Sequence, residues 1–413
     1  MKKLLLTLLF ACTLTSCFND PDDEFIEQCL TPTNIVLSNT THESTSITWE
    51  DSNTSATYTI EYGISGFTLG LGETITTTDT TATLTGLEAN TSYDIYIQSI
   101  CSNNVSMLTN VTHFTTNEPL VVPQFVNNLS DMHIYTGNLE DLNPSTYTFE
   151  YELITPLFTD YAYKQRLIAL PPGEAMQYVD NGLPTFPDNT VIAKTFYYFN
   201  DERDTSLGKK IMETRILIKQ NGTWVTGNYK WNDAQTEATL DPNGSVVTYN
   251  YVDNTGQPKS VNYEIPANTD CFTCHSNNSI ITPIGPKLRS MHFNNQLQSF
   301  VDQNLLTNIT DVSNVTTLPD WQNDRDYTLM QRARAYFDVN CAHCHSPGGT
   351  CDTTSILDFT FERPFDETNI YLQRFTIQAR TQNYANDYSM PLIGTTMIHT
   401  EGYNLIEAFV NSL

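Results

Sequence analysis

Two short segments of the chain share one spacing of cysteine and histidine. The first is Cys271–His275, with the sequence CFTCH, and the second is Cys341–His345, with the sequence CAHCH. Two cysteines three positions apart lie on one helical turn, so both sulfurs can reach the same ligand. The histidine that follows can approach that ligand from beside them. A ligand large enough to use all three groups needs a cavity, and this requirement constrains the fold more than any other feature.

The C-x-x-C-H spacing is the signature of covalent c-type haem attachment, with thioethers from the cysteines and iron ligation by the histidine. The sequence therefore predicts two haems with the following attachment and ligand residues: Cys271, Cys274, His275, Cys341, Cys344 and His345. Two alternatives use the same cysteines. A zinc site of four thiolates leaves both histidines unexplained, and a thioredoxin-like redox pair needs a βαβ context.

The second motif has the fuller context. Residues 327–340 form an amphipathic pattern typical of a helix that leads into Cys341. A Ser389–Pro391 segment and a final helical pattern follow. This order resembles a class I cytochrome c domain, and the resemblance implies Met390 as the sixth iron ligand. The alternatives are a gap-filling core role for Met390 and ligation by Met397 or His399.

The first motif has no methionine at the corresponding place. Residues 282–287, of sequence TPIGPK, could cover one haem face. The sixth ligand stays open among four residues: Met291, His292, Met212 and His133. A weak or absent ligand would leave this iron accessible to small molecules.

The N-terminus has the pattern of an export signal. Lys2 and Lys3 precede an apolar stretch, and Leu14–Cys17 resembles a bacterial lipobox. We expect a lipoprotein signal peptide over residues 1–16, lipidation at Cys17 and an acidic tether over residues 17–29. The alternatives are an ordinary signal peptide with a chance cysteine and a plain solvated linker. The expected location is the cell envelope, on the outer membrane, facing the periplasm or the surface.

Charge excludes several classes of function. The chain has 47 acidic and 20 basic residues among 413, a formal charge of −27. Sequence-independent nucleic-acid binding and attraction to anionic lipid both need basic patches. No apolar stretch of spanning length lies outside the first 16 residues. We expect membrane contact through the lipid anchor only, and a redox partner protein with a basic contact surface.

Residues 30–117 alternate in short strands separated by turns. Trp49 lies on the second strand, and the segment Leu87–Tyr93 has the form Leu-x-Ala-x-Thr-x-Tyr. These features resemble a fibronectin type III domain with its tyrosine corner, with Ala89 where the family pattern has proline. Cys29 and Cys101 flank this region and are disulfide candidates in an exported protein, the alternative being two free thiols.

Residues 118–266 are predicted to be a β-rich domain, with period-2 alternation at residues 193–198 and 213–218. Residues 224–231 suggest a hairpin around Gly227 and Asn228. Two further regions follow: residues 267–318 carry the first haem motif, and residues 319–413 form the cytochrome c-like domain with the second. The expected fold class is a multidomain chain with an all-β sandwich, a β-rich middle and a mainly α-helical haem region.

The whole region after the sandwich resembles a family of bacterial dihaem c-type cytochromes, with a β-rich part before two haem sites. The matching stretches are residues 129–131, 155–162, 193–197, 213–217, 231–232, 263–266 and 332–336. The resemblance implies a membrane-anchored dihaem electron carrier. The alternatives are a peroxidase-like dihaem enzyme with one open haem and a surface-binding lipoprotein. Cys351 has no role in any of these readings.

Overall fold

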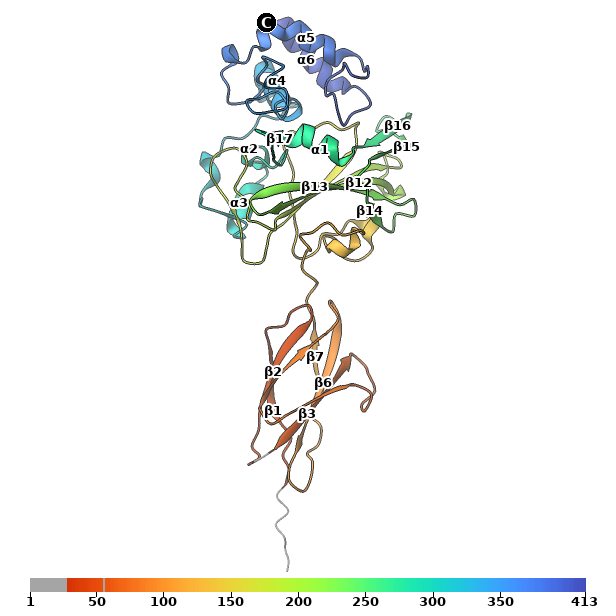
Figure 1. Cartoon of the computed structure of the whole chain (residues 1–413), viewed down its shortest axis with the longest axis vertical. Helices are drawn as coiled ribbons and strands as arrows, with labels where there is room; N and C mark the ends of the chain where they lie inside the picture. Colours follow the sequence, from red (N-terminus) through yellow and green to blue (C-terminus); the bar gives the residue numbers. More distant parts are fainter. Residues whose placement is uncertain (1–27, 55) are drawn as a thin grey trace, which may run out of the picture. The chain divides into compact units, whose positions relative to one another are not determined.

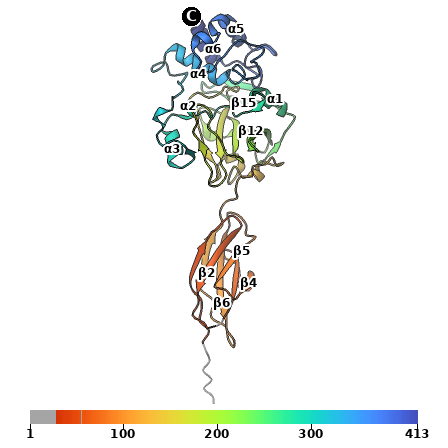
Figure 2. The same cartoon turned by 60° about the vertical axis from the view of Figure 1, so that its left-hand side comes forward.

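The computed structural model describes residues 28–54 and 56–413. The predicted signal peptide, Cys17 and nearly all of the acidic tether lie outside the described residues. The chain divides into two compact units, one up to Glu118 and one over Pro119–Leu413 (Figures 1 and 2). Each unit is described by itself below.

The first unit is a sandwich of two antiparallel sheets, with strand orders β1-β2-β5 and β4-β3-β6-β7. Its strands are β1 Thr33–Ser38, β2 Ser44–Glu50, β3 Thr57–Ile64, β4 Glu73–Thr77, β5 Thr81–Thr85, β6 Ser92–Ile100 and β7 Thr112–Thr115. Alternate side chains of β2, β3 and β6 point inward and form the core. Trp49 lies in this core, with its ring centroid 5.1 Å from that of Tyr58.

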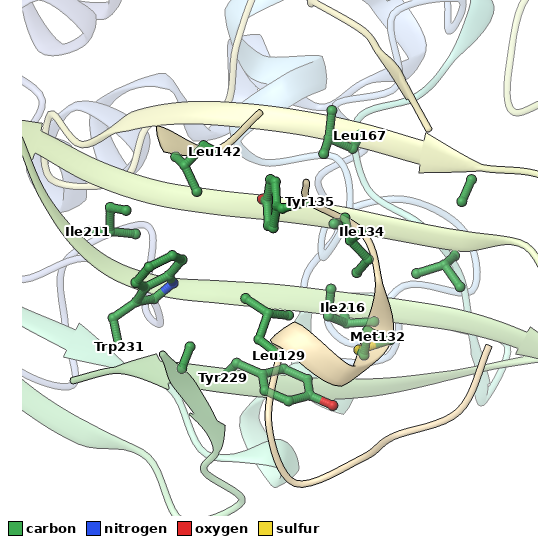
Figure 3. Close-up of a cluster of buried hydrophobic side chains, with 14 of the residues drawn as sticks. Leu129, Met132, Ile134, Tyr135, Leu142, Leu167, Ile211, Ile216, Tyr229 and Trp231 are labelled. Carbon is green, nitrogen blue, oxygen red and sulfur yellow. The ribbon is translucent and has the colours of Figure 1, made fainter. Parts of the chain in front are cut away.

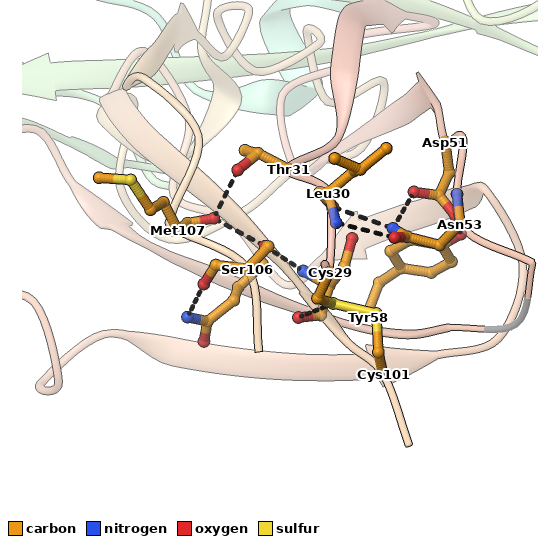
Figure 4. The surroundings of a disulfide bond; sticks show 11 residues. Cys29, Leu30, Thr31, Asp51, Asn53, Tyr58, Cys101, Ser106 and Met107 are labelled. Atoms are coloured by element: carbon orange, nitrogen blue, oxygen red, sulfur yellow. Dashed lines mark hydrogen bonds between the residues drawn. A yellow bond between two sulfur atoms is a disulfide. The ribbon is translucent and has the colours of Figure 1, made fainter. Parts of the chain in front are cut away.

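Two local features close the sandwich. The Tyr93 hydroxyl accepts a hydrogen bond from the Glu88 backbone N–H at 2.8 Å, which is the tyrosine corner expected from the sequence. Cys29 and Cys101 form a disulfide across a sequence separation of 72 residues (Figure 4). Asn53 binds the backbone of Leu30 next to this disulfide through both its amide oxygen and its amide nitrogen, which fixes the start of the described chain.

The second unit is built on a six-stranded antiparallel sheet of order β14-β13-β12-β11-β9-β8. The strands of this unit are β8 Phe149–Glu150, β9 Tyr163–Ala169, β10 Met176–Gln177, β11 Val191–Phe199, β12 Lys209–Gln220, β13 Thr223–Trp231, β14 Ala238–Leu240, β15 Ser245–Val252, β16 Pro258–Ile265, β17 Ser276–Asn277, β18 Ile280–Ile281 and β19 Leu306–Thr307. The α-helices are α1 Asn268–His275, α2 Leu288–Met291, α3 Gln296–Asp302, α4 Leu329–Asn340, α5 Ile370–Gln382 and α6 Thr400–Ser412.

The two faces of this sheet are covered by different parts of the chain. One face packs against the segment that precedes the sheet, where Leu129, Met132 and Ile134 cover the strands (Figure 3). The opposite face carries Ile168, Ile192 and Leu217, which pack against α2 and α3. Helices α4, α5 and α6 group together, and α1 lies between them and the sheet in both views (Figures 1 and 2).

The predicted hairpin around Gly227 and Asn228 is wrong. Residues 223–231 form one continuous strand, β13. The turn lies earlier, at Asn221 and Gly222, whose φ angles of 50° and 77° suit a tight hairpin. Gly227 serves packing instead, because a Cβ there would lie 2.5 Å from Cε1 of Phe125.

The helix predicted before the second motif is present as α4. The Thr328 hydroxyl accepts from the Gln331 backbone N–H at 3.3 Å and caps its first turn. The final helix is present as α6, and its apolar side packs with α4 around Phe337 and Phe409. Among residues 28–54 and 56–413, no helix has the length and apolarity needed to cross a membrane.

Candidate functional site

The first cysteine motif lies on a helix. Helix α1 contains Cys271, Cys274 and His275, and it packs against β13. Nδ1 of His275 lies 2.8 Å from the carbonyl oxygen of Thr282, so an Nδ1–H donor leaves Nε2 free to bind a metal. Burial lowers the pKa of His275 to about 3, which keeps the ring neutral as a ligand must be.

Two cavities border this motif, with volumes of about 330 and 70 Å³. Cys274, Lys194 and His343 line both of them. Cys271 and His275 line the smaller cavity. Both cavities lie on the face of the sheet opposite the segment shown in Figure 3, because Lys194 shares its face with Ile192.

The second motif begins where α4 ends. Cys341 follows the last residue of the helix, and the backbone N–H of His345 donates to the Cys341 carbonyl at 2.9 Å. This turn faces a cavity of about 640 Å³. Its lining includes every residue predicted for the second site: Cys341, Cys344, His345 and Met390. Apolar side chains from α4, α5 and the loop after the motif complete the wall, among them Phe337, Phe359 and Ile377.

The loop that carries Met390 is tied to the β-rich part of the unit. Both carboxylate oxygens of Asp160 accept from the Thr396 backbone N–H at 2.9 Å, and the Thr396 hydroxyl donates to the same carboxylate at 2.8 Å. Asp160 is buried, and burial raises its pKa. The Met390 backbone N–H also donates to the Arg380 carbonyl at 2.8 Å. Met390 therefore has a defined position at the edge of the cavity.

The two motifs lie side by side, although 66 positions separate His275 from Cys341 (341 − 275 = 66). Asn277 and Gly349 form a β-bridge, and the Asn278 N–H donates to the Gly348 carbonyl at 2.7 Å. Ligand atoms of Cys274, His343 and Cys344 lie within 4.8 Å of one another. Sequence reasoning treated the two motifs separately and did not predict this contact.

A buried ion-pair cluster fixes the segments on either side of the motifs. The Asp338 carboxylate, which has no exposed side-chain area, accepts from Arg289 at 2.8 Å and Lys287 at 3.2 Å. Arg289 also binds Glu362. Burial alone would raise the pKa of Asp338, but the charges of Lys287 and Arg289 outweigh it and the pKa is lowered. Helix α2 is thereby bound to α4.

The candidates named for the sixth ligand at the first motif do not line its cavities. Met291 and Met212 are core residues, and Nδ1 of His292 lies 2.7 Å from the Val315 carbonyl oxygen. His133 lies near the Leu120 carbonyl on the segment before the sheet. Sequence reasoning missed His343, whose buried Nδ1 has no hydrogen-bond partner among the described residues. The sequence feature that could have identified it is its position between the two cysteines of the second motif.

The second motif fits a c-type haem, because it places two thiols and an imidazole at the wall of a cavity of about 640 Å³, within the usual range for cofactor sites of about 300–1,000 Å³. The first motif has the same donor set, but its two thiols and imidazole together line only the smaller cavity of about 70 Å³, next to the one of about 330 Å³. A zinc site fits less well: among the described residues, the cluster that could hold a metal contains two of the four motif thiols and His343. Cys351 lines the second cavity as well and is not part of a motif.

The comparisons with known proteins concern the first unit. Residues 30–115 match the family model of the fibronectin type III domain. This confirms the sandwich predicted from the sequence. The described chain is thus multidomain and strand-rich, with helices in its C-terminal region.

Several solved structures are similar to part of the chain. A computer-based redesign of a β-sandwich protein is 28% identical, covering 21% of this chain and 95% of that one, with a TM-score of 0.20. A structure described as a myokine is 19% identical, covering 22% of this chain and all of that one, with a TM-score of 0.21. The FN1–FN3 domains of chicken CNTN1 are 16% identical, covering 22% and 31%, with a TM-score of 0.21. No curated protein matches the chain.

Proposed function

We propose that the protein is an extracytoplasmic, membrane-anchored dihaem c-type cytochrome that transfers electrons. The observation that carries the proposal is the arrangement of the second motif, where Cys341, Cys344, His345 and Met390 line one cavity. When bound, a c-type haem supplies one-electron exchange between ferric and ferrous iron. The chain's residues attach, ligate and enclose it.

Each residue has a defined task in this proposal. The motif cysteines hold the cofactor covalently, and His275 and His345 provide the nitrogen ligands. The Thr282 carbonyl orients His275 by accepting its Nδ1–H. Met390 provides the sulfur ligand at the second site, which favours ferrous iron. The apolar wall around Phe337 and Phe359 excludes water and thereby raises the reduction potential.

The contact between the motifs supports transfer between two centres within one unit. Cys274 and Cys344 belong to different motifs, and their sulfurs lie in one cluster with His343. Haems attached at the two motifs would therefore lie next to each other. An electron entering at one site could leave from the other, and the 27 excess negative charges of the chain would favour a partner with a basic contact surface.

Haem content tests the proposal directly. Protein matured with a working haem-attachment system should carry two covalent haems, measured by intact mass and by the pyridine haemochrome spectrum. The double variants C271A/C274A and C341A/C344A should each carry one. Cys351→Ala is the matched control, because Cys351 lines the second cavity outside the motif and its loss should leave both haems. Wild-type protein with fewer than two haems would contradict the proposal.

A zinc site is the competing use of the same cysteines, and the cluster of Cys274, His343 and Cys344 is the observation that favours it. Metal analysis separates the two. A zinc protein would keep its metal in C271A and lose it in C274A, because Cys271 is not in the cluster. A haem protein would lose the first covalent haem in the double variant C271A/C274A and contain no stoichiometric zinc.

The first site decides between a carrier and a peroxidase-like enzyme with one open haem. We propose that His343 would be the second protein ligand of the iron there, because it lines both cavities of the first motif as well as the cavity of the second, and its Nδ1 has no partner among the described residues. Both haems should then be low-spin. His343→Ala should convert one of them to a high-spin spectrum, and His292→Ala, which lies outside these cavities, should not. A high-spin haem in the wild-type protein with peroxide turnover would favour the enzyme.

A further inference from the structure

Three cationic side chains stand directly opposite one another on neighbouring strands of the large sheet. Lys194 on β11 is the register partner of Arg166 on β9 and of Arg215 on β12. Like charges directly opposite in a sheet repel and destabilise the pairing. The arrangement is notable in a chain with 20 basic and 47 acidic residues. We call these residues, together with Lys164 on the same face of β9, the cationic row.

The carboxylates around the cationic row do not neutralise it. Glu213 is fully buried and pairs with Arg215 through Nη2 at 2.6 Å. The Tyr263 hydroxyl donates to the same Glu213 oxygen, at 2.6 Å. Glu152 pairs with Arg166 at 3.0 Å but is more than half exposed. The buried Asp160 also acts on Lys164 through its charge, so three acids face four cations.

Neither lysine forms a salt bridge among the described residues, although the charge of Asp160 acts on Lys164 and that of Glu213 acts on Lys194. Lys164 donates to the Ala162 carbonyl at 3.1 Å. The Lys194 side chain makes no hydrogen bond among the described residues, and its Nζ lies 5.9 Å from the centre of the Phe196 ring. Burial, with Arg166 and Arg215 adding to it, lowers the pKa of Lys194 to about 7. Lys194 is partly exposed and lines both cavities, and a cation held there without a salt bridge favours an anionic ligand.

The cationic row lines the same cavities as the first cysteine motif. Lys194 and Cys274 border both cavities, Arg215 and Cys271 the smaller one, and Lys164 and Arg166 the larger one. The cysteine end is at β13, where Asn228, the register partner of Arg215, has its Oδ1 4.0 Å from Sγ of Cys271. From there the row runs across the sheet, with Arg215 on β12, Lys194 on β11 and Arg166 on β9. Neighbouring strands in a sheet are about 4.8 Å apart.

This direction matches the shape of a haem. The vinyl groups that react with cysteines lie on one edge of the macrocycle, and the two propionates lie on the opposite edge. A haem attached at Cys271 and Cys274 and lying over the sheet would extend its carboxylates toward the row. Guanidinium and ammonium groups are the usual partners of such carboxylates.

We propose that Lys194, with Arg166 and Lys164, forms a carboxylate-binding site for the propionates of the haem on the first motif. The inference rests on the proposed haem function. The same cations would also bind a free dicarboxylate. The experiments must therefore distinguish haem propionates from a free dicarboxylate as the ligand. A cation so close to the haem also stabilises its reduced state, because reduction adds a negative charge.

The first experiment is a redox titration of C341A/C344A protein, which retains only the first haem. Lys194→Met should shift the reduction equilibrium toward ferric haem by about tenfold, or about 59 mV for one electron. Lys194→Arg keeps the positive charge, so its reduction potential should stay close to that of the protein with Lys194. Lys210→Met is the matched control, because Lys210 lies on β12, pairs with Asp233 and borders neither cavity. Equal potentials for Lys194→Met and Lys210→Met would overturn the proposal.

The second experiment uses full-length protein without haem, made by changing the four motif cysteines to alanine. Succinate, as a probe dicarboxylate, should raise its melting temperature, and Lys194→Met should abolish that rise. Lys194→Met by itself should raise the melting temperature of the haem-free protein, because it removes an uncompensated charge. Haem-loaded protein should show no succinate effect, since the propionates occupy the site. No succinate effect in the haem-free protein would overturn the proposal.

These arms separate the outcomes. A succinate effect of equal size in haem-loaded and haem-free protein would overturn the propionate assignment and identify a free dicarboxylate as the ligand. Protein that binds no haem, yet responds to succinate through Lys194, would refute the proposed function and the propionate assignment while leaving the carboxylate site. Failure of Lys194→Met to fold is covered by Lys194→Arg, which keeps the charge and should keep both the potential and the succinate response.

Discussion

The core of the fibronectin type III domain consists of apolar side chains, from Ile47 to Ile97, and Asp94 is the one charged group among the buried residues that the structure describes there. The C-terminal unit buries six charged residues among those described: Asp160, Arg166, Glu213, Arg289, Arg334 and Asp338. It also contains the three cavities described above. Buried charges and empty volume both cost stability. The fibronectin type III domain largely avoids both, whereas the C-terminal unit contains both, as the proposed cofactor sites would require.

The comparison predicts that the two units fail in different ways. In the C-terminal unit, loss of one charge should leave its partners buried and unpaired. In the fibronectin type III domain, loss of a cross-link should act on the unfolded chain. The following predictions are ordered from the largest expected effect to the smallest.

Asp338→Asn should lower the free energy of unfolding of the C-terminal unit by about 3–5 kcal/mol, because Lys287 and Arg289 lose their buried counter-charge. Denaturant unfolding followed in the far-UV signal measures this. Glu362→Gln is the control: Glu362 also pairs with Arg289 but is half exposed, and its loss should cost about 1 kcal/mol or less. If Asp338→Asn cost no more than Glu362→Gln, the buried charges would not distinguish the stability of the C-terminal unit from that of the fibronectin type III domain.

The same variant gives a pH test. The pKa of Asp338 is lowered in the folded protein, so its contribution to stability is present above the unfolded pKa of about 3.9 and is lost as the pH falls through the folded value. The stability difference between wild type and Asp338→Asn should therefore be constant near neutral pH and shrink on acidification below about pH 4. A difference that grows in acid would contradict the assigned ion pair.

The double variant C29A/C101A should lower the stability of the fibronectin type III domain by about 2–5 kcal/mol, because the unfolded chain regains the freedom of a long loop. Trp49 is the tryptophan of this domain and the other three lie in the C-terminal unit, so the fluorescence difference between the full chain and its Trp49→Phe variant reports the transition. The transition of the C-terminal unit should not move, since each unit has its own core. Coupled shifts of both transitions would show that the units do not unfold independently.

Tyr93→Phe should cost about 1 kcal/mol in the fibronectin type III domain, because the Glu88 N–H loses its acceptor. Tyr96→Phe on the same strand is the control, since its hydroxyl makes no hydrogen bond among the described residues and its ring packs against Phe67. Denaturation midpoints from Trp49 fluorescence distinguish the two variants. Equal midpoints would mean that the Tyr93 hydroxyl adds no stability beyond the packing of its ring.

Much of this architecture could be predicted from local sequence. Alternating strands and the Leu87–Tyr93 segment predicted the fibronectin type III domain, and family matching confirms it. The pattern before Cys341 predicted α4, because amphipathic periodicity is a local property. The error at Gly227 has a physical cause: glycine can mark a turn or a close approach, and only the position of Phe125 distinguishes them. The cytochrome c-like fold of the last region stays a prediction.

The sequence by itself determined the chemistry available to this protein: two sets of thiols and imidazole at fixed spacing, and a methionine that follows the second. Tertiary structure decided what lies beside them. The contact between Cys274 and Cys344, the position of His343 and the alignment of Arg166, Lys194 and Arg215 depend on pairing between distant segments. Strand register and helix packing place such residues together, and no local pattern encodes which strands become neighbours.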